Sequence, residues 1–525
     1  MGGKGGISVR AKAIMIQGTG SHVGKSVLTA ALCRIFKQDG HRVCPFKSQN
    51  MALNSFVTKD GGEMGRAQVV QAQAAGIEPS VDMNPILLKP TGDMKSQVIV
   101  MGKPLENMTA REYHDNYVVE AMKVVQAAYN RLSQAYDIIV IEGAGSPVEI
   151  NLKDTEIVNM RIAKMADAPV ILVTDIDKGG ALAWVVGTLE LLEPDERERV
   201  KGIVINKFRG DRELLNPAIE FLEQKTGKPV LGVIPYFKGF SIPEEDSVPE
   251  VKVLKSRVRN LPEKLDVAVI YLPHISNFTD FDPIDEEPDV DLRYIKRRGD
   301  LGNPDLIILP GTKNTIDDLI SLKETGMAED IIKLANQGTP VMGICGGFQM
   351  LGKKLYDPHH TESQREEASG LGLLDIETTF YPEKTTRQVW GQVMGRGLFF
   401  DGLRGKRVRG YEIHMGKTRL GAGVVPAFKI IRDPYGEINI DDGAVKDNGL
   451  IFGTYIHGIF DNDLFRRSFI NKLRVRRGWD PLEVEAEYCY DKALERDFNM
   501  LADTVRANMD IGKIYKIMGL EEKYL

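Results

Sequence analysis

A glycine-rich loop near the start of the chain, Gly18–Ser26, constrains the fold more than any other stretch. The apolar run Ala13–Ile16 precedes it, and the helical pattern Val27–Phe36 follows it. A strand, a glycine loop and a helix in this order are the usual setting of a phosphate-binding loop. The N–H groups and the dipole at the start of the helix both favour an anion. The sequence therefore predicts a nucleotide site at the edge of a parallel α/β sheet.

Individual residues of this loop have distinct expected roles. Gly18, Thr19 and Gly24 would surround the phosphates with backbone, Lys25 would reach the terminal phosphates, and the hydroxyl of Ser26 would bind Mg²⁺. The strict pattern has glycine where this chain has Thr19, so the loop is a variant whose first glycine is Gly18.

Apolar stretches alternate with helical patterns as far as Pro235, which predicts a doubly wound parallel sheet. Polar residues follow the ends of several of these stretches: Lys47, Gln49, Asn50, Glu142, Asn206 and Lys207. The carboxyl ends of parallel strands face the ligand crevice of such a sheet. We expect Glu142 to contact the metal ion, with a capping carboxylate as the alternative. Lys47 would hold a substrate carboxylate or a phosphate, unless it is a solvated lysine, and Asn206 and Lys207 would hold the base.

Length and composition bound the remaining possibilities. A chain of 525 residues predicts two or three domains, and its net charge of −6 with interspersed signs favours neither nucleic acid nor an anionic membrane as partner. No apolar run approaches the roughly 20 residues that span a bilayer. The four cysteines show no CxxC spacing, so we expect no disulfide framework or zinc site and a cytoplasmic location.

The second half carries a different signal, centred on Cys345. A short apolar strand turns through glycines into a helix, with Cys345 at the turn. This arrangement is typical of a nucleophile elbow, where the helix dipole stabilises a thiolate. The N–H of Gly346 and the turn at Gly311 would stabilise an oxyanion. His457 and His414 both follow strand-like stretches, and we expect His457 to be the base that works with Cys345.

Five stretches of the first half resemble the synthetase domain of the cobyric acid synthase family, which belongs with dethiobiotin synthetase among ATP-dependent carboxylate-activating enzymes. They are Gly18–Ser26, Pro45–Met51, Glu142–Pro147, Asp175–Gly180 and Asn206–Asp211. The departure at Thr19 is itself the dethiobiotin-synthetase form of the loop.

Three stretches of the second half resemble class I glutamine amidotransferases, specifically the subgroup attached to enzymes that amidate cobyrinic acid. They are Gly343–Met350, Gly410–Gly416 and Thr454–Gly458. Most class I members have a carboxylate two residues after the histidine, and this chain has Ile459 there, as the subgroup does. What orients His457 is therefore open.

The two resemblances imply a glutamine-dependent amide ligase that uses ATP and Mg²⁺ and works through an acyl phosphate. The implied substrate is a corrinoid, adenosylcobyrinic acid a,c-diamide, amidated at its b, d, e and g carboxylates in cobalamin biosynthesis. We expect a synthetase domain over 12–238, a linker over 239–263, an amidotransferase domain over 264–464 and a helical extension over 465–525.

Three alternatives remain at this point. A cobyrinic acid a,c-diamide synthase has the same domains but other target carboxylates, and the stretch Phe46–Met51 disfavours it. An amidotransferase of a cell-wall precursor usually divides the two domains between two chains. An ATP-dependent partitioning switch would have an inert second domain, against which Cys345 and His457 argue, as does the lack of an amphipathic membrane-binding helix.

Overall fold

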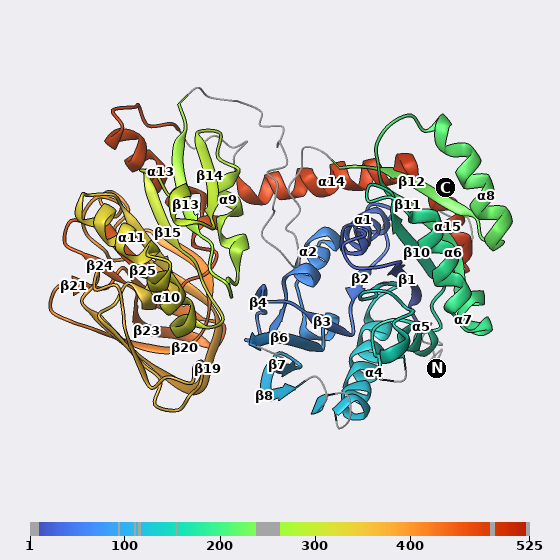
Figure 1. The fold of residues 1–525 in the computed structure, drawn as a ribbon, viewed down its shortest axis with the longest axis horizontal. Helices are drawn as coiled ribbons and strands as arrows, with labels where there is room; N and C mark the ends of the chain where they lie inside the picture. Colours follow the sequence, from blue (N-terminus) through green and yellow to red (C-terminus); the bar gives the residue numbers. More distant parts are fainter. Residues whose placement is uncertain are drawn as a thin grey trace, which may run out of the picture. The chain divides into compact units, whose positions relative to one another are not determined.

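The computed structural model describes residues 10–92, 95–109, 112–113, 117–153, 155–237, 263–483 and 489–520 (Figure 1). The predicted linker, 239–263, lies outside the described residues except for Glu263. The chain forms two compact units: the first comprises Met1–Ala52, Met64–Ser256 and Leu494–Leu525, and the second comprises Leu53–Glu63 and Arg257–Ala493. Neither unit is therefore one continuous segment. Among the described residues, no helix combines the length and apolarity that crossing a bilayer requires.

The first unit is built on a six-stranded sheet, as the alternating pattern predicted. In spatial order its strands are β12 (Val230–Pro235), β11 (Val200–Phe208), β10 (Val170–Asp175), β1 (Lys12–Gly18), β9 (Ile138–Glu142) and β2 (Val43–Phe46). All neighbouring pairs are parallel. The sheet is buried between helices, which explains why its strands are almost continuously apolar. The doubly wound parallel α/β fold is thus confirmed.

The helices and smaller strands of the first unit complete this architecture. Among the described residues before the C-terminal segment, its helices include α1 (Lys25–Gln38), α2 (Arg66–Ala75), α4 (Val118–Ala135), α5 (Met160–Met165), α6 (Ala181–Leu191), α7 (Pro194–Arg199) and α8 (Asn216–Thr226). A four-stranded sheet contains β3 (Gln49–Met51), β6 (Ile86–Gly92), β7 (Lys95–Val100) and β8 (Lys103–Thr109). Two further short strands lie where the chain changes unit: β4 (Ser55–Val57) belongs to the second unit, and β5 (Glu63–Gly65) begins at Glu63, the last residue of that segment.

The end of the chain is helical, as expected, and returns to the core of the first unit. From Leu494 onward, α14 (Tyr490–Asn508) and α15 (Ile511–Ile517) share a hydrophobic cluster with α1. The rings of Phe36 and Tyr515 lie 5.3 Å apart within it. The extension therefore covers the helix that begins at the phosphate loop.

The second unit contains a parallel sheet and an antiparallel sheet. The first has the order β14 (Val290–Ile295), β13 (Leu265–Ile270), β15 (Leu306–Leu309), β16 (Val341–Ile344), β25 (Ile451–Thr454), β24 (Ala444–Lys446) and β21 (Val424–Val425). The second has the order β18 (Glu367–Ser369), β17 (Lys354–Tyr356), β19 (Ile376–Val393), β22 (Phe428–Asp433) and β23 (Gly436–Asp442), with β20 (Arg407–Leu420) paired to β19. Its helices include α9 (Asp282–Asp285), α10 (Thr315–Glu324), α11 (Met327–Asn336), α12 (Gly346–Met350) and α13 (Asp463–Arg476).

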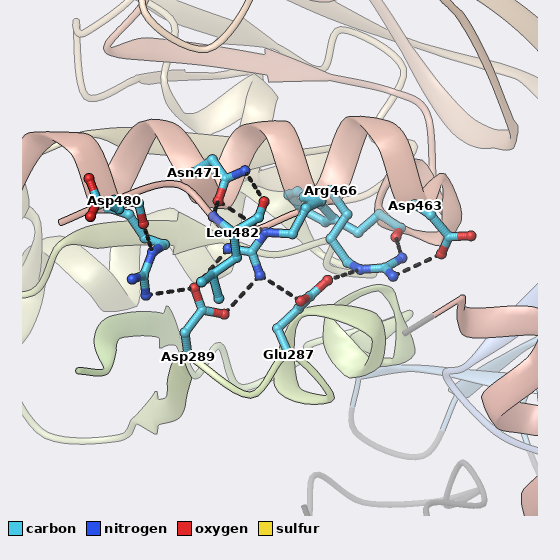
Figure 2. A network of polar contacts seen from close by, with 10 residues as sticks. Glu287, Asp289, Asp463, Arg466, Asn471, Asp480 and Leu482 are labelled. Atoms are coloured by element: carbon cyan, nitrogen blue, oxygen red, sulfur yellow. Dashed lines mark hydrogen bonds and ion pairs between the residues drawn. The ribbon is translucent and has the colours of Figure 1, made fainter. Parts of the chain in front are cut away.

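A buried ionic network joins α13 to the chain before β14 (Figure 2). Arg467 donates to Glu287 at 2.7 Å and to both carboxylate oxygens of Asp289 at 2.9 and 2.7 Å. Arg466 donates to Glu287 at 2.7 Å, and Arg474 donates to Asp289 at 3.2 Å. Because each buried charge faces opposite charges, the network tolerates burial that an isolated ion would not. It fixes α13 against the sheet.

Candidate active sites

Cys345 lies at the sharp turn between β16 and α12. Its backbone φ of 51° with ψ of −108° is a conformation that residues with a side chain rarely adopt. Such strain persists where the surrounding structure enforces it, and it clusters at catalytic positions. Cys345 is only 8% exposed, and its thiol donates to the carbonyl oxygen of Ile413 at 3.6 Å. The turn thus has the geometry of the nucleophile elbow that the sequence predicts.

His457 is the histidine that pairs with Cys345. It follows β25, the strand next to β16, and its ring hydrogen-bonds to the Cys345 thiol. His414, the other histidine in a strand context, stacks instead on Tyr455 with ring centroids 3.9 Å apart, and its Nδ1 contacts the carbonyl oxygen of Gly416 at 2.9 Å. Of the two candidate histidines, the geometry therefore selects His457 as the partner of Cys345.

Asp280 orients His457, the role that the sequence left open. Its Oδ2 lies 2.6 Å from Nδ1 of His457, and its Oδ1 accepts the N–H of Gly458 at 2.9 Å. Burial alone lowers the pKa of His457, but the charge and hydrogen bond of Asp280, with the Cys345 thiol, outweigh it and raise this pKa to about 10. The site therefore favours an imidazolium at His457, between the Asp280 carboxylate and the Cys345 sulfur.

The two predicted oxyanion positions lie beside this triad. A Cβ built on Gly346 would come within 3.1 Å of the backbone nitrogen of Thr312, and one built on Gly311 would come within 3.2 Å of Cε1 of His457. The turn after β15 therefore lies against the start of α12 and beside His457. Backbone N–H groups from two elements at one point can stabilise a tetrahedral oxyanion.

In the first unit, the phosphate loop joins β1 to α1 as expected. Gly24, with φ of 100°, precedes α1, and a Cβ there would lie 2.0 Å from Nδ2 of Asn206, so only glycine fits. The Nζ of Lys25 donates to the carbonyl oxygens of Gly20 at 2.9 Å and Gly145 at 3.1 Å. The lysine therefore spans from its own loop to the loop after β9.

Glu142 is the centre of a buried polar cluster at the carboxyl end of β9. Its Oε1 accepts from the hydroxyl of Ser26 at 2.8 Å and from the Nζ of Lys47 at 3.0 Å. Its Oε2 accepts from the side-chain amide of Gln71 at 2.5 Å. The carboxylate is 1% exposed, so the positive charge of Lys47 offsets the cost of burying it. Three predicted site residues thus come together, and Gln71 is an addition from α2.

The remaining predicted residues of the first unit make polar contacts of their own. Asn50 donates to Gln68 at 3.1 Å, and Gln49 accepts from the hydroxyl of Tyr113 at 2.6 Å.

The Nδ2 of Asn206 donates to the carbonyl oxygen of Val23 at 2.8 Å. Lys207 donates to the carbonyl oxygen of His22 at 2.6 Å and pairs with Asp175 at 3.0 Å. Both Asn206 and Lys207 thus hold the phosphate loop itself, and Thr19 donates to Thr174 at 3.2 Å.

Comparison with known proteins shows which families the two halves of the chain resemble. Residues 14–249 match the CobQ/CobB/MinD/ParA nucleotide binding domain, and residues 266–465 match the CobB/CobQ-like glutamine amidotransferase domain. The cobyric acid synthase of Pelotomaculum thermopropionicum is 57% identical over 513 residues, which cover 97% of each chain. That of Moorella thermoacetica is 57% identical over 511 residues, covering 97% of this chain and 98% of the other. The chain therefore belongs to the cobyric acid synthase family of glutamine-dependent amide ligases.

Proposed function

We propose that this protein amidates the b, d, e and g carboxylates of adenosylcobyrinic acid a,c-diamide, using glutamine as nitrogen donor and ATP as energy source. The product would be adenosylcobyric acid. The observation that carries the proposal is the presence on one chain of a Cys345–His457–Asp280 triad and a phosphate loop whose Ser26 meets Glu142. Membership of the family supports this choice of substrate. The four free thiols suit a reducing cytoplasm.

The glutaminase half-reaction would take place at Cys345. The thiolate attacks the side-chain amide carbon of glutamine, and N–H groups at Gly346 and at the Gly311–Thr312 turn stabilise the oxyanion. His457 then gives its proton to the departing nitrogen, which releases ammonia and leaves a glutamyl thioester. Water, deprotonated by His457, hydrolyses the thioester. Asp280 keeps the imidazole in place throughout and stabilises its charged form.

The synthetase half-reaction would take place around Glu142. The substrate carboxylate attacks the γ-phosphorus of ATP and ADP leaves, while Lys25 neutralises charge on the transferred group. Ammonia then attacks the acyl phosphate, releasing inorganic phosphate and forming the amide. Gly18, Thr19 and Gly24 would bind the phosphates with Lys25 and Ser26.

The side chains near the loop suit the magnesium ion that accompanies ATP. Ser26 and Glu142 offer a hydroxyl and a carboxylate 2.8 Å apart, and oxygen ligands of this kind are those that Mg²⁺ prefers. They would hold the ion, which supplies positive charge at the phosphates. Lys47, already buried beside Glu142, would move to a phosphate or a substrate carboxylate, and Gln49 and Asn50 would bind the corrinoid. Asn206 and Lys207 would contact the nucleotide base from the edge of the loop.

The test of the proposal is the reaction itself. The purified protein is incubated with MgATP, glutamine and either cobyrinic acid or adenosylcobyrinic acid a,c-diamide, and the products are followed by mass spectrometry. We expect the a,c-diamide to undergo successive OH-to-NH₂ exchanges until four are complete. Use of cobyrinic acid with arrest after two exchanges would identify an a,c-diamide synthase instead.

A further inference from the structure

A segment from the N-terminal half of the chain, Leu53–Glu63, belongs to the second unit. It follows β3 directly in the sequence and contains β4 and the start of β5. Three contacts anchor it to β19: Glu63 with Lys384 at 2.5 Å, the carbonyl oxygen of Val57 with the amide of Gln388 at 2.9 Å, and the carbonyl oxygen of Gly61 with the hydroxyl of Thr386 at 2.9 Å. Because the side chains of Glu63 and Lys384 are only 0% and 6% exposed, the segment is an integral part of this unit.

One end of the segment holds the turn that carries Asp280. The side-chain oxygen of Asn54 accepts the N–H of Phe278 at 3.3 Å. The backbone N–H of Ser55 donates to the side-chain oxygen of Asn277 at 3.2 Å. Asn277 has a positive φ of 52°, so the chain turns sharply there, three residues before Asp280. These bonds therefore restrain the start of the short helix that presents the carboxylate to His457.

The same segment reaches His457 through Tyr411 of β20. The hydroxyl of Tyr411 donates to the carbonyl oxygen of Ser55 at 3.3 Å and accepts from the amide of Asn277 at 3.2 Å. Its ring is stacked on the imidazole of His457, with centroids 5.3 Å apart and planes 18° apart. Its backbone exchanges two hydrogen bonds with that of His457, at 3.1 and 2.9 Å. The tyrosine thus links the segment to the histidine on both ring and backbone.

The apolar side of the segment packs beside Cys345 as well. Val57 forms a buried cluster with Tyr411 and Ile413, against which Phe56 packs. Ile413 supplies the carbonyl oxygen that the Cys345 thiol contacts. One segment therefore supports the surroundings of all three members of the triad.

We propose that Leu53–Glu63 is a positioning element of the glutaminase site, acting through Tyr411 on His457 and through the Asn277–Phe278 turn on Asp280. The inference rests on the proposed glutaminase role of the triad. It has a direct consequence for the organisation of the enzyme: residues 264–464 alone do not contain the complete support of the glutaminase site, because part of it is encoded between the phosphate loop and α2.

A pair of tyrosine substitutions in the full-length protein tests the proposal. Tyr411→Phe keeps the stacked ring but removes the hydroxyl that joins Ser55 to Asn277. Tyr435→Phe is the matched control, because its hydroxyl contacts the carbonyl oxygen of Asp60 in the same segment from a side chain that is 79% exposed. Glutamine-driven and ammonium-driven synthesis are measured for both, with kcat and KM for glutamine and the pH profile of glutaminase activity.

For Tyr411→Phe we expect glutamine-driven kcat to fall about fivefold to tenfold, because the variant loses the two buried hydrogen bonds of the hydroxyl. The change in KM should be smaller. The alkaline limb of its pH profile should move to lower pH, and ammonium-driven synthesis should match wild type. Asn54→Ala should reproduce the selective loss, and Tyr435→Phe should not. Wild-type glutaminase in both Tyr411→Phe and Asn54→Ala would overturn the inference, as would equal loss of the glutamine- and ammonium-driven reactions. Failure of the proposed function would instead appear as glutamine use by Cys345→Ser.

Discussion

Replacing Asp280 by asparagine should impair glutamine-driven synthesis severely while leaving the synthetase half-reaction intact. Asparagine has nearly the same shape, so the 2.6 Å contact with Nδ1 of His457 can persist. The carboxylate charge that favours the imidazolium is lost, however. An asparagine can also hold the ring in the wrong tautomer, as happens when the buried acid of a serine-protease triad is neutralised.

The size of the effect follows from the environment of His457. Its pKa is about 10 instead of 6.5, although burial by itself lowers it. Since one pKa unit corresponds to about 1.4 kcal/mol, the imidazolium is stabilised by roughly 5 kcal/mol. Asp280 is the larger of the two partners that raise this pKa, and Cys345 is the other. Removing one partner of a buried charge pair commonly costs about 3 kcal/mol or more. A loss of that size corresponds to a decrease of about 10²-fold in kcat.

The assay compares glutamine with ammonium chloride as nitrogen source for wild type, Asp280→Asn and Asp291→Asn. Asp291 is an exposed carboxylate on β14, so its replacement is a matched neutralisation away from the triad. We expect only Asp280→Asn to lose the glutamine-driven reaction, and its ammonium-driven rate should equal that of wild type. A fully active Asp280→Asn variant would refute the orienting role of this carboxylate.

Three further predictions concern the phosphate loop, the buried ionic network and pH. Lys25→Ala should abolish synthesis from glutamine and ammonium alike, because both need the acyl phosphate, and near-normal turnover would exclude the loop from catalysis. Arg467→Ala should lower the free energy of unfolding of the second unit by about 3 kcal/mol in denaturant titrations, because it leaves the buried carboxylates of Glu287 and Asp289 without one of their cations. Arg297→Ala, at an exposed ion pair, should change that free energy by less than about 1 kcal/mol. Because His457 loses its proton only as pH rises through about 10, glutaminase activity should fall on approach to that pH, and a fall near pH 7 would contradict the assignment.

The parallel strands and their connections were predictable because their signal is local. Buried strands such as β9 and β10 are continuous apolar runs, and each is bounded by turn residues. The long strands β19 and β20 gave no comparable signal. Residues in the middle of β19 are polar and half-buried or exposed, so neither continuous apolarity nor clean alternation marks the strand. Its length becomes evident only when its pairing with β20 is known.

Some of the site residues could likewise be predicted from local sequence, and others could not. Cys345 and Lys25 stand in glycine-rich turns whose sequence carries the geometry, and His457 was distinguishable from His414 only through its expected partner. Asp280 was not found, because it lies 177 residues before the histidine that it orients, in a stretch without a recognised motif. The missing carboxylate at Ile459 was the available signal: it indicated that an orienting group had to come from elsewhere in the chain.

The most direct test of the central claim, that one chain carries separate glutaminase and synthetase chemistries, is Cys345→Ser assayed with glutamine and with ammonium chloride. Serine keeps the turn but offers a hydroxyl that is far from ionised at neutral pH, so glutamine-driven synthesis should fall by orders of magnitude. Free ammonia reaches the acyl phosphate without the thiol, so synthesis from high ammonium at alkaline pH should persist at the wild-type rate. Loss of both reactions in a folded variant, or survival of both, would contradict the account.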